Sequence, residues 1–133
     1  MASGNTSRFI KFSPHIDKRG ILAVCEGSQD IPFEIKRVFW IYAVPEYIER
    51  GDHKHEKGEQ VIIAVNGKFR VVVDGLETLM HDPTTGILVR KGEIVSLDMF
   101  SKGAVALVLC SDHYDPSDVI PNERKYSLTG KLG

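Results

Sequence analysis

Short apolar runs separated by turn residues recur along the chain, and no segment before residue 116 keeps a helical period over three turns. Apolar and polar residues alternate most clearly in the segments 33–42 and 68–73. A period of two is expected of a β-strand with one buried face. If 33–42 is one strand, its first face carries Phe33, Ile35, Arg37, Phe39 and Ile41, and its second face carries Glu34, Lys36, Val38, Trp40 and Tyr42.

Two turn dipeptides, Asn66-Gly67 and Asp74-Gly75, each follow a β-branched run. Asn-Gly tolerates the positive φ angles of a type I′ turn, so it predicts a hairpin. Turns at intervals of about 8–12 residues are typical of an all-β sandwich or barrel. A short helix is possible only in the tail 115–128, where Pro121 would interrupt it.

Length and composition narrow the class of protein. The 133 residues predict one domain over 1–133, and the apolar share of 42% and charged share of 26% are those of an ordinary globular protein. A net charge of −1 gives no reason to expect nucleic acid or an anionic membrane as a partner.

No run reaches the ~20 apolar residues of a membrane span, and the N-terminal stretch has no apolar core of signal-peptide length. Cys25 and Cys110 each lie in an apolar run, as buried reduced cysteines do. We expect a cytoplasmic protein.

Two histidines two residues apart, His53 and His55, come just before an apolar β-branched run. Residues i and i+2 of a strand point to the same face, so the two imidazoles would lie side by side. Such a pair suits a metal site or a shared proton-transfer task. Two exposed residues at the start of a strand are the third possibility.

The spacing around this pair is similar to the first motif of the cupin fold, a β-sandwich rolled into a small barrel. His-x-His is followed by four residues, Gln60, six residues and Gly67, with glutamine in the usual glutamate position. Val95 stands where the second motif supplies a third histidine. Zinc, iron or manganese sites want three or four protein ligands. We therefore expect no metal.

A wider resemblance runs from residue 17 to about 120. It is carried by DKRGIL (17–22), DIPFEIKRVFWIY (30–42), RGDHKHEKGEQVIIAVNGKFRVVVDG (50–75) and FSKGAVALVLCSDHYDPSDVI (100–120). In this order the segments resemble the sugar 3,4-ketoisomerase family, cupins that act on nucleotide-linked 4-keto-6-deoxy sugars. The resemblance implies a cupin-type jelly-roll barrel with a short irregular C-terminal tail.

The activity that this resemblance implies is that of a dTDP-4-keto-6-deoxyglucose 3,4-ketoisomerase of deoxysugar biosynthesis. A ketone moves from C4 to C3 by proton transfer through an enediol, and no cofactor is required if a base and an oxyanion donor are in place. Histidine suits the base because its pKa lies near working pH. We expect His55 to be the base and His53 to handle the oxygen protons. Tyr42 is the nearest tyrosine for a catalytic phenol, although a rim or core position is equally compatible with it.

Substrate-binding residues can be proposed from the same resemblance. Arginine binds pyrophosphate oxygens in bidentate fashion, which suggests Arg37, Arg50 and Arg19. Arg37 shares a face with apolar residues, so it either contacts the ligand or forms a structural ion pair. By strand parity, Gln60 shares the face of His53 and His55 if Gly58 leaves the register undisturbed, and it is then expected to hydrogen-bond sugar hydroxyls. The candidates for stacking on the base or the sugar are Phe39 and Trp40. Family members form homodimers by strand exchange, which predicts a homodimer here.

Several pocket positions depart from the family pattern. A pair of tyrosines is expected at Phe39 and Trp40, and Trp followed by His or Arg at Ile94 and Val95. These departures favour one alternative, a non-catalytic cupin module that binds a nucleotide sugar. A second alternative is a sugar epimerase, which returns the proton to the same carbon. A metal-dependent dioxygenase is the least favoured.

Overall fold

A computed structural model describes residues 8–46, 48–55 and 57–121, with only the backbone described for 51–55 and 118–121. Described strands are β1 (Phe9–Lys11), β2 (Pro14–Asp17), β3 (Gly20–Ala23), β4 (Arg37–Tyr42), β5 (Arg50–His55), β6 (Gln60–Asn66), β7 (Phe69–Val73), β8 (Leu76–Met80), β9 (Thr85–Val89), β10 (Ile94–Asp98), β11 (Val105–Cys110) and β12 (Val119–Pro121). A 3₁₀ turn, η1 (Pro116–Asp118), precedes β12.

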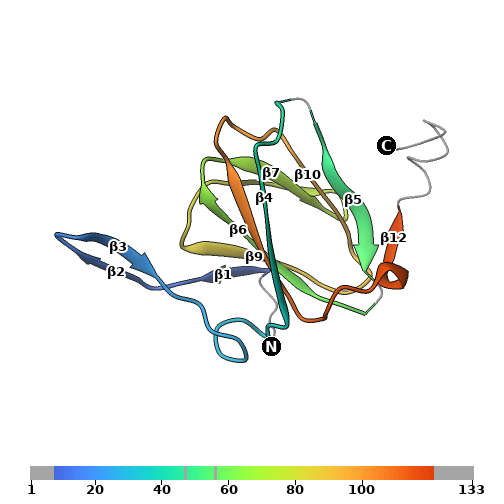
Figure 1. Cartoon of the computed structure of the whole chain (residues 1–133), viewed down its shortest axis with the longest axis horizontal. Helices are drawn as coiled ribbons and strands as arrows, with labels where there is room; N and C mark the ends of the chain where they lie inside the picture. The colour runs from blue at the N-terminus through green and yellow to red at the C-terminus, as the bar shows by residue number, and fades with distance from the viewer. Residues whose placement is uncertain (1–7, 47, 56, 122–133) are drawn as a thin grey trace.

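Two five-stranded antiparallel sheets form the body, in the orders β1-β9-β6-β11-β4 and β12-β5-β10-β7-β8. The expected all-β sandwich is confirmed. Among the described strands, β2 and β3 pair only with each other, and Figure 1 shows this hairpin projecting away from the two sheets. No helix among the described residues is long and apolar enough to cross a membrane.

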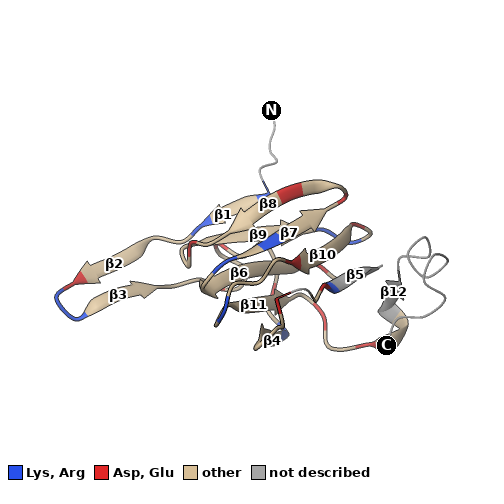
Figure 2. Cartoon of the chain, turned by 90° about the horizontal axis from the view of Figure 1, so that it is seen from above, with Lys and Arg blue, Asp and Glu red and all other residues tan. Residues whose placement is uncertain are grey.

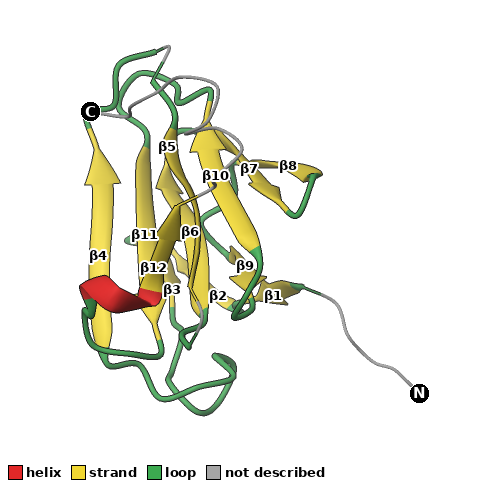
Figure 3. Cartoon of the chain, turned by 90° about the vertical axis from the view of Figure 1, so that its right-hand side faces the viewer, coloured by secondary structure: helices red, strands yellow, loops and turns green. Residues whose placement is uncertain are grey.

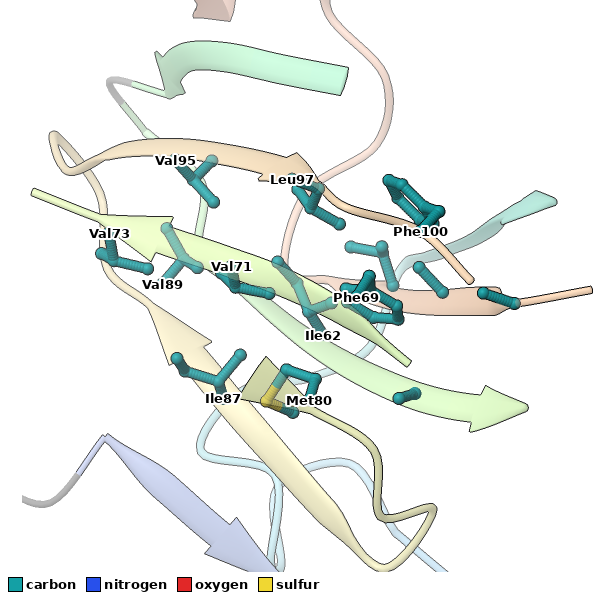
Figure 4. Packing of buried hydrophobic residues seen from close by; sticks show 14 of the residues in the cluster. Ile62, Phe69, Val71, Val73, Met80, Ile87, Val89, Val95, Leu97 and Phe100 are labelled. Carbon is teal, nitrogen blue, oxygen red and sulfur yellow. The ribbon is translucent and has the colours of Figure 1, made fainter. Parts of the chain in front are cut away.

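The main apolar core lies between the sheets. Ile62, Ile87 and Val108 come from the first sheet, while Phe69 and Val95 come from the second. Figure 4 shows these side chains of β7 and β10 directed toward those of β6 and β9. Burying these side chains removes apolar surface from water, which stabilises the fold by about 25 cal/mol per Å² of buried apolar surface.

A second cluster covers the outer side of the first sheet. Val61, Ile63 and Leu109 are buried there beneath Phe12 and Ile31. The segment between β3 and β4 therefore lies over the sheet as a third apolar layer, which reaches β6, β9 and β11.

The strand predicted over 33–42 is shorter than expected, because β4 begins only at Arg37. Phe33 and Ile35 pack against the outer cluster, whereas Phe39 and Ile41 pack against the core between the sheets. The prediction that all five residues share one face was wrong for the first two. The chain crosses from outside the sheet to its edge before the strand pairing starts.

The two turn dipeptides have different outcomes. Asp74-Gly75, with φ angles of 47° and 84°, joins β7 and β8 in a two-residue hairpin in which Val73 pairs with Leu76. Asn66-Gly67 joins β6 to β7, which belong to different sheets, so the predicted hairpin there was wrong. Gly67 packs against the 101–104 turn so closely that a Cβ atom would lie 2.7 Å from the Ser101 Oγ atom.

The tail prediction is tested only up to Pro121. Within it the described structure consists of η1 and β12, and the residues beyond 121 lie outside the described ranges.

Candidate active site

Three polar or thiol side chains form a row across the inner face of the first sheet. Arg37 opens β4, Cys110 ends β11 and Gln60 opens β6, and the register pairs Cys110 with both neighbours. The Arg37 Nη2 atom lies 3.5 Å from the Cys110 Sγ atom, and the Gln60 Nε2 atom lies 3.8 Å from it. At this end of the barrel the apolar interior therefore gives way to hydrogen-bonding groups.

Gln60 and Cys110 are buried, at 6% and 3% exposure, while Arg37 is half-buried. Burial raises the pKa of the Cys110 thiol above its ordinary value, although the nearby Arg37 guanidinium opposes the shift. The thiol is therefore neutral at ordinary pH and acts as a weak hydrogen-bond acceptor toward the guanidinium.

The Arg37 guanidinium also contacts two aromatic rings. Its Cζ atom lies 5.4 Å from the ring centroid of Phe39 and 5.6 Å from that of Tyr114. Both distances are within the ~6 Å range of cation–π attraction. None of the ion pairs among the described side chains involves Arg37. The structural ion pair considered for this arginine is therefore not formed with any carboxylate of the described part.

The predicted strand carrying the two histidines is β5, which pairs with β10 on one side and β12 on the other. Position 53 pairs with Val95, a core residue, and position 55 pairs with position 119. The register shifts by one residue, so Asp52 is the extra residue of a bulge. The side chains of His53 and His55 lie outside the described set.

The parity argument that connected Gln60 to the histidines fails, because β5 and β6 belong to different sheets. The side chain of Gln60 nevertheless lies on the inner face, beside Cys110. The pairing of β6 with β11 and β9 sets this orientation, because Gln60 lies across from Cys110 and Val89, which also face the interior.

The chain after β11 crosses from the first sheet to the second. We name residues 111–118 the closing segment; it ends with η1, and β12 then pairs with β5. Figure 3 shows η1 at the same end of the barrel as the start of β4, with β12 leading from η1 toward β5. The closing segment thus lies beside the polar row and connects that end of the barrel to the histidine strand.

Three other predicted site residues lie on or near the far part of β4. Trp40 and Tyr42, at 59% and 65% exposure, point to the outer face, opposite Arg37 and Phe39. Arg50 is exposed at the start of β5. A pocket of ≈ 290 Å³ is lined by β4 residues Phe39 to Tyr42, the chain that follows them, and Arg50. Trp40 and Tyr42 are therefore brought together with Arg50, but not with the polar row.

Arg19 lies at the tip of the β2–β3 hairpin. Its side chain is 85% exposed and forms an ion pair with Asp17, with 2.6 Å between the Nη2 and Oδ2 atoms. This contact lowers the pKa of the Asp17 carboxyl. Figure 2 shows the basic tip at the end of two strands that carry few charges. Within one chain, Arg19 is apart from the other candidates.

Two positions that supply metal ligands in the usual cupin motifs carry other groups here. Val95 is apolar and only 2% exposed, and the Gln60 amide is directed at a thiol. Among side chains that the structure describes, no group of three or more His, Cys, Asp and Glu residues is placed to hold a metal ion, and the two histidines lie outside that set.

Sequence reasoning did not select Cys110 or Tyr114 for the site. Cys110 reads as a core cysteine in an apolar run, which its burial matches. Tyr114 lies in the charged stretch 112–118, which is typical of an exposed loop. The pairing of β11 with β4 brings Cys110 next to Arg37, and the path of the chain after β11 brings Tyr114 there. The alternation in β11 alone would have placed Cys110 on the inner face.

The sheets, the interior core and the polar row at one barrel end define a cupin-type β-sandwich with a candidate small-molecule site. Comparison with known proteins makes this more specific. The family model "FdtA: WxcM-like, C-terminal" matches residues 5–130. The chain belongs to this family.

Three relatives illustrate the family. A TDP-4-oxo-6-deoxy-alpha-D-glucose-3,4-oxoisomerase from Aneurinibacillus thermoaerophilus is 37% identical over 127 residues, which cover 90% of this chain and 91% of the relative. A histidine-to-asparagine mutant of the 3,4-ketoisomerase QdtA from Thermoanaerobacterium thermosaccharolyticum, in complex with TDP-4-keto-6-deoxyglucose, is 39% identical with a TM-score of 0.79, covering 89% of this chain and 88% of that one. A 3,4-ketoisomerase from Helicobacter canadensis is 32% identical with a TM-score of 0.84, covering 92% and 96%.

Proposed function

We propose that this protein is a 3,4-ketoisomerase acting on a thymidine-diphosphate (TDP)-linked 4-keto-6-deoxyglucose in deoxysugar biosynthesis. The observation that carries the proposal is the polar row of Arg37, Cys110 and Gln60 at the end of an otherwise apolar barrel. The family membership and the ketoisomerase relatives support the same conclusion.

The reaction is an internal transfer of hydrogen that leaves the composition of the sugar unchanged. A base removes the proton on C3, and the electron pair forms an enediolate when O4 becomes the oxyanion. After O4 gains a proton, C4 is protonated from the base side and O3 loses its proton, which leaves the ketone at C3. General acid–base catalysis by positioned side chains suffices for every step.

We assign the carbon proton to His55 and the oxygen protons to His53. Support comes from the β5 register, because position 53 lies across from Val95, whose side chain faces the core, and cross-strand partners share a face of the sheet. The bulge at Asp52 re-aims the strand just before the pair, as bulges beside active sites do. Tyr42 remains a candidate phenol, but its exposed outer position makes it a weaker one.

Substrate contacts follow from the same geometry. Arg37, with no carboxylate partner among the described ion pairs, is suited to an anionic diphosphate. Gln60 is positioned on the inner face to hydrogen-bond the sugar, and Phe39 presents a ring beside the guanidinium. Arg50 and Trp40 line the neighbouring pocket at the far part of β4.

A homodimer is part of the proposal. The hairpin exposes Ile16, Ile21 and Leu22 at 71%, 68% and 61%, and an isolated two-stranded hairpin is marginally stable in water. β4 is an edge strand whose outer face is apolar. A second copy is the partner that covers both surfaces. In such a dimer, Arg19 at the hairpin tip would be a candidate contact for the substrate of the partner.

A cytoplasmic location also belongs to the proposal. It is supported by two free cysteines, Cys25 and Cys110, because reduced thiols persist in reducing compartments.

A non-catalytic binding module is the second candidate function. The observation that favours it is the buried Val95, an apolar side chain that supplies no proton at the position paired with His53. In this alternative the pocket binds the nucleotide sugar without turnover.

A proton NMR time course in deuterated water tests the proposal, with TDP-4-keto-6-deoxyglucose as substrate. We expect 3-keto sugar signals with deuterium at C4 for the wild type and at least a ~100-fold loss of rate for His55→Asn, since a positioned acid–base group contributes about 10²–10⁴-fold. His81→Asn is the matched control, because His81 is an exposed histidine between β8 and β9.

Other outcomes of the same experiment identify the alternatives. Deuterium exchange with no movement of the ketone would point to an epimerase. Saturable binding with neither exchange nor product would make the binding module the better account.

A further inference from the structure

Tyr114 has an unusual combination of exposure and contact. It is 70% exposed, yet its ring centroid lies 5.6 Å from the Cζ atom of the half-buried Arg37. Because the ring is mostly exposed, packing in the core does not fix its position. The backbone that carries Tyr114 has to place the ring beside Arg37.

That backbone is anchored before Tyr114. The Ser111 Oγ atom accepts a hydrogen bond from the Glu59 backbone N–H at 2.8 Å and donates one to the Asp112 carboxylate at 2.6 Å. The Ser111 N–H donates to the Glu59 carbonyl at 3.0 Å. The start of the closing segment is thereby held against the residue that leads into β6.

It is anchored after Tyr114 as well. The Asp115 carboxylate accepts hydrogen bonds from the Ser117 backbone N–H at 3.0 Å and from the Ser117 hydroxyl at 2.7 Å. The chain then enters β12, which pairs with β5. Tyr114 thus lies between two local anchors that determine where its ring is presented.

Among the described side chains, three groups converge on the Arg37 guanidinium: the Phe39 ring, the Tyr114 ring and the Cys110 thiol. The first and third belong to the sheet itself, and only Tyr114 comes from outside it. A free arginine side chain has several rotatable bonds, so holding it in one orientation before a ligand arrives reduces the ordering cost of binding.

We propose that Tyr114 is a positioning residue that holds the Arg37 guanidinium in the orientation that binds the diphosphate of a nucleoside-diphosphate sugar. This assignment rests on the proposed function. With one Nη2–H directed at the Cys110 thiol, the planar fork has further N–H donors for two phosphate oxygens. Tyr114 acts through Arg37 and not on the reacting carbons, so it affects substrate affinity more than the chemical step.

Calorimetric titration of TDP and of thymidine into four proteins tests the assignment: the wild type, Tyr114→Ala, Tyr114→Phe and His113→Ala. We expect Tyr114→Ala to weaken TDP binding about three- to thirtyfold, the range of a lost cation–π contact. Tyr114→Phe retains the ring and should stay within about twofold of the wild type. His113→Ala, at an exposed neighbouring position, is the control and should do the same.

Thymidine lacks the diphosphate, so its affinity should be the same in all four proteins. In steady-state kinetics, Tyr114→Ala should raise KM by a similar factor and leave kcat within about twofold. The melting temperature should hardly change, because the ring is mostly exposed.

Unchanged TDP affinity in Tyr114→Ala, with a wild type that binds TDP and turns over substrate, would overturn the assignment alone. An equal loss of TDP and thymidine affinity would also overturn it, since Tyr114 would then act on the nucleoside or on the fold. A wild type that binds no TDP would overturn the proposed function and the assignment together.

Discussion

The interior of the barrel and its outer apolar surface contain similar residue types in opposite environments. Between the sheets, residues such as Phe69 and Val71 are fully buried. On the outer face of β4 and on the β2–β3 hairpin, apolar side chains are 44–71% exposed: Ile16, Ile21, Leu22, Val38, Trp40 and Tyr42. Scattered exposed apolar residues are normal, but a hairpin and an edge strand that each carry three of them indicate a surface for association.

The two faces of β4 show the difference within one strand. Arg37, Phe39 and Ile41 face the interior and contribute to the candidate site, while the residues between them face outward. The predicted site residues divide along this line, because neighbours in sequence lie on opposite faces of a strand. The inner face is expected to serve ligand binding and the outer face mainly to serve association, although Trp40 on the outer face also lines the pocket beside Arg50.

The largest effect that we expect comes from the interior. Phe69 is 0% exposed and its ring stacks on that of Phe100, with 5.1 Å between the centroids. Phe69→Ala should lower the free energy of unfolding by about 3–5 kcal/mol, the usual cost of a large cavity. Chemical denaturation would measure it. Leu79→Ala, at 52% exposure on β8, is the control and should change stability by less than ~1 kcal/mol. Equal losses in the two variants would contradict the distinction between interior and surface.

The outer surface is tested by association, with a somewhat smaller expected effect. Ile21→Asp on the hairpin should weaken the dimer by about 3 kcal/mol, because a symmetric contact loses a buried isoleucine twice, at about 1.5 kcal/mol each, the lower end of the usual range. Analytical ultracentrifugation over a concentration series would show the shift toward monomer. Leu79→Asp, at an exposed site off the hairpin, should leave the association unchanged. A wild type that is monomeric throughout would remove the proposed role of this surface.

Much of the fold follows from local pattern, and the misassignments have a common cause. Period-two alternation and turn residues locate strands well, because both reflect the backbone near the residue itself. Which strands pair is a property of distant segments. Asp74-Gly75 forms its hairpin, but Asn66-Gly67 has the stronger hairpin sequence and instead connects two sheets, where close packing against Ser101 also requires glycine.

The candidate site was predictable to the same extent. Arg37 and Phe39 could be assigned to one face, because both lie within a single strand. The contact of Arg37 with Cys110 depends on the pairing of β4 with β11, and that with Tyr114 depends on the path of the closing segment. Neither leaves a periodic signal near Arg37. The roles of His53 and His55 stay predictions that the NMR experiment tests.

The smallest effect that we expect concerns an ion pair whose side chains are less exposed than the surface residues and less buried than the core. The Arg8 and Glu93 side chains are 19% and 17% exposed, and their Nη1 and Oε1 atoms lie 2.7 Å apart. The hydrogen bond from Arg8, reinforced by the Arg90 backbone N–H, holds the pKa of Glu93 below its ordinary 4.5. A carboxyl whose folded pKa is depressed stabilises the fold above its unfolded pKa and loses that contribution as the pH falls through the folded pKa.

Glu93→Gln should therefore lower the free energy of unfolding by about 1–2 kcal/mol at pH 7. The difference from the wild type should shrink below pH 4.5, as measured by denaturant unfolding across pH. Glu77→Gln, at an exposed carboxylate, is the control. If the difference in unfolding free energy between Glu93→Gln and the wild type stays constant down to pH 3, the charge of Glu93 is not what anchors β1 to the first sheet.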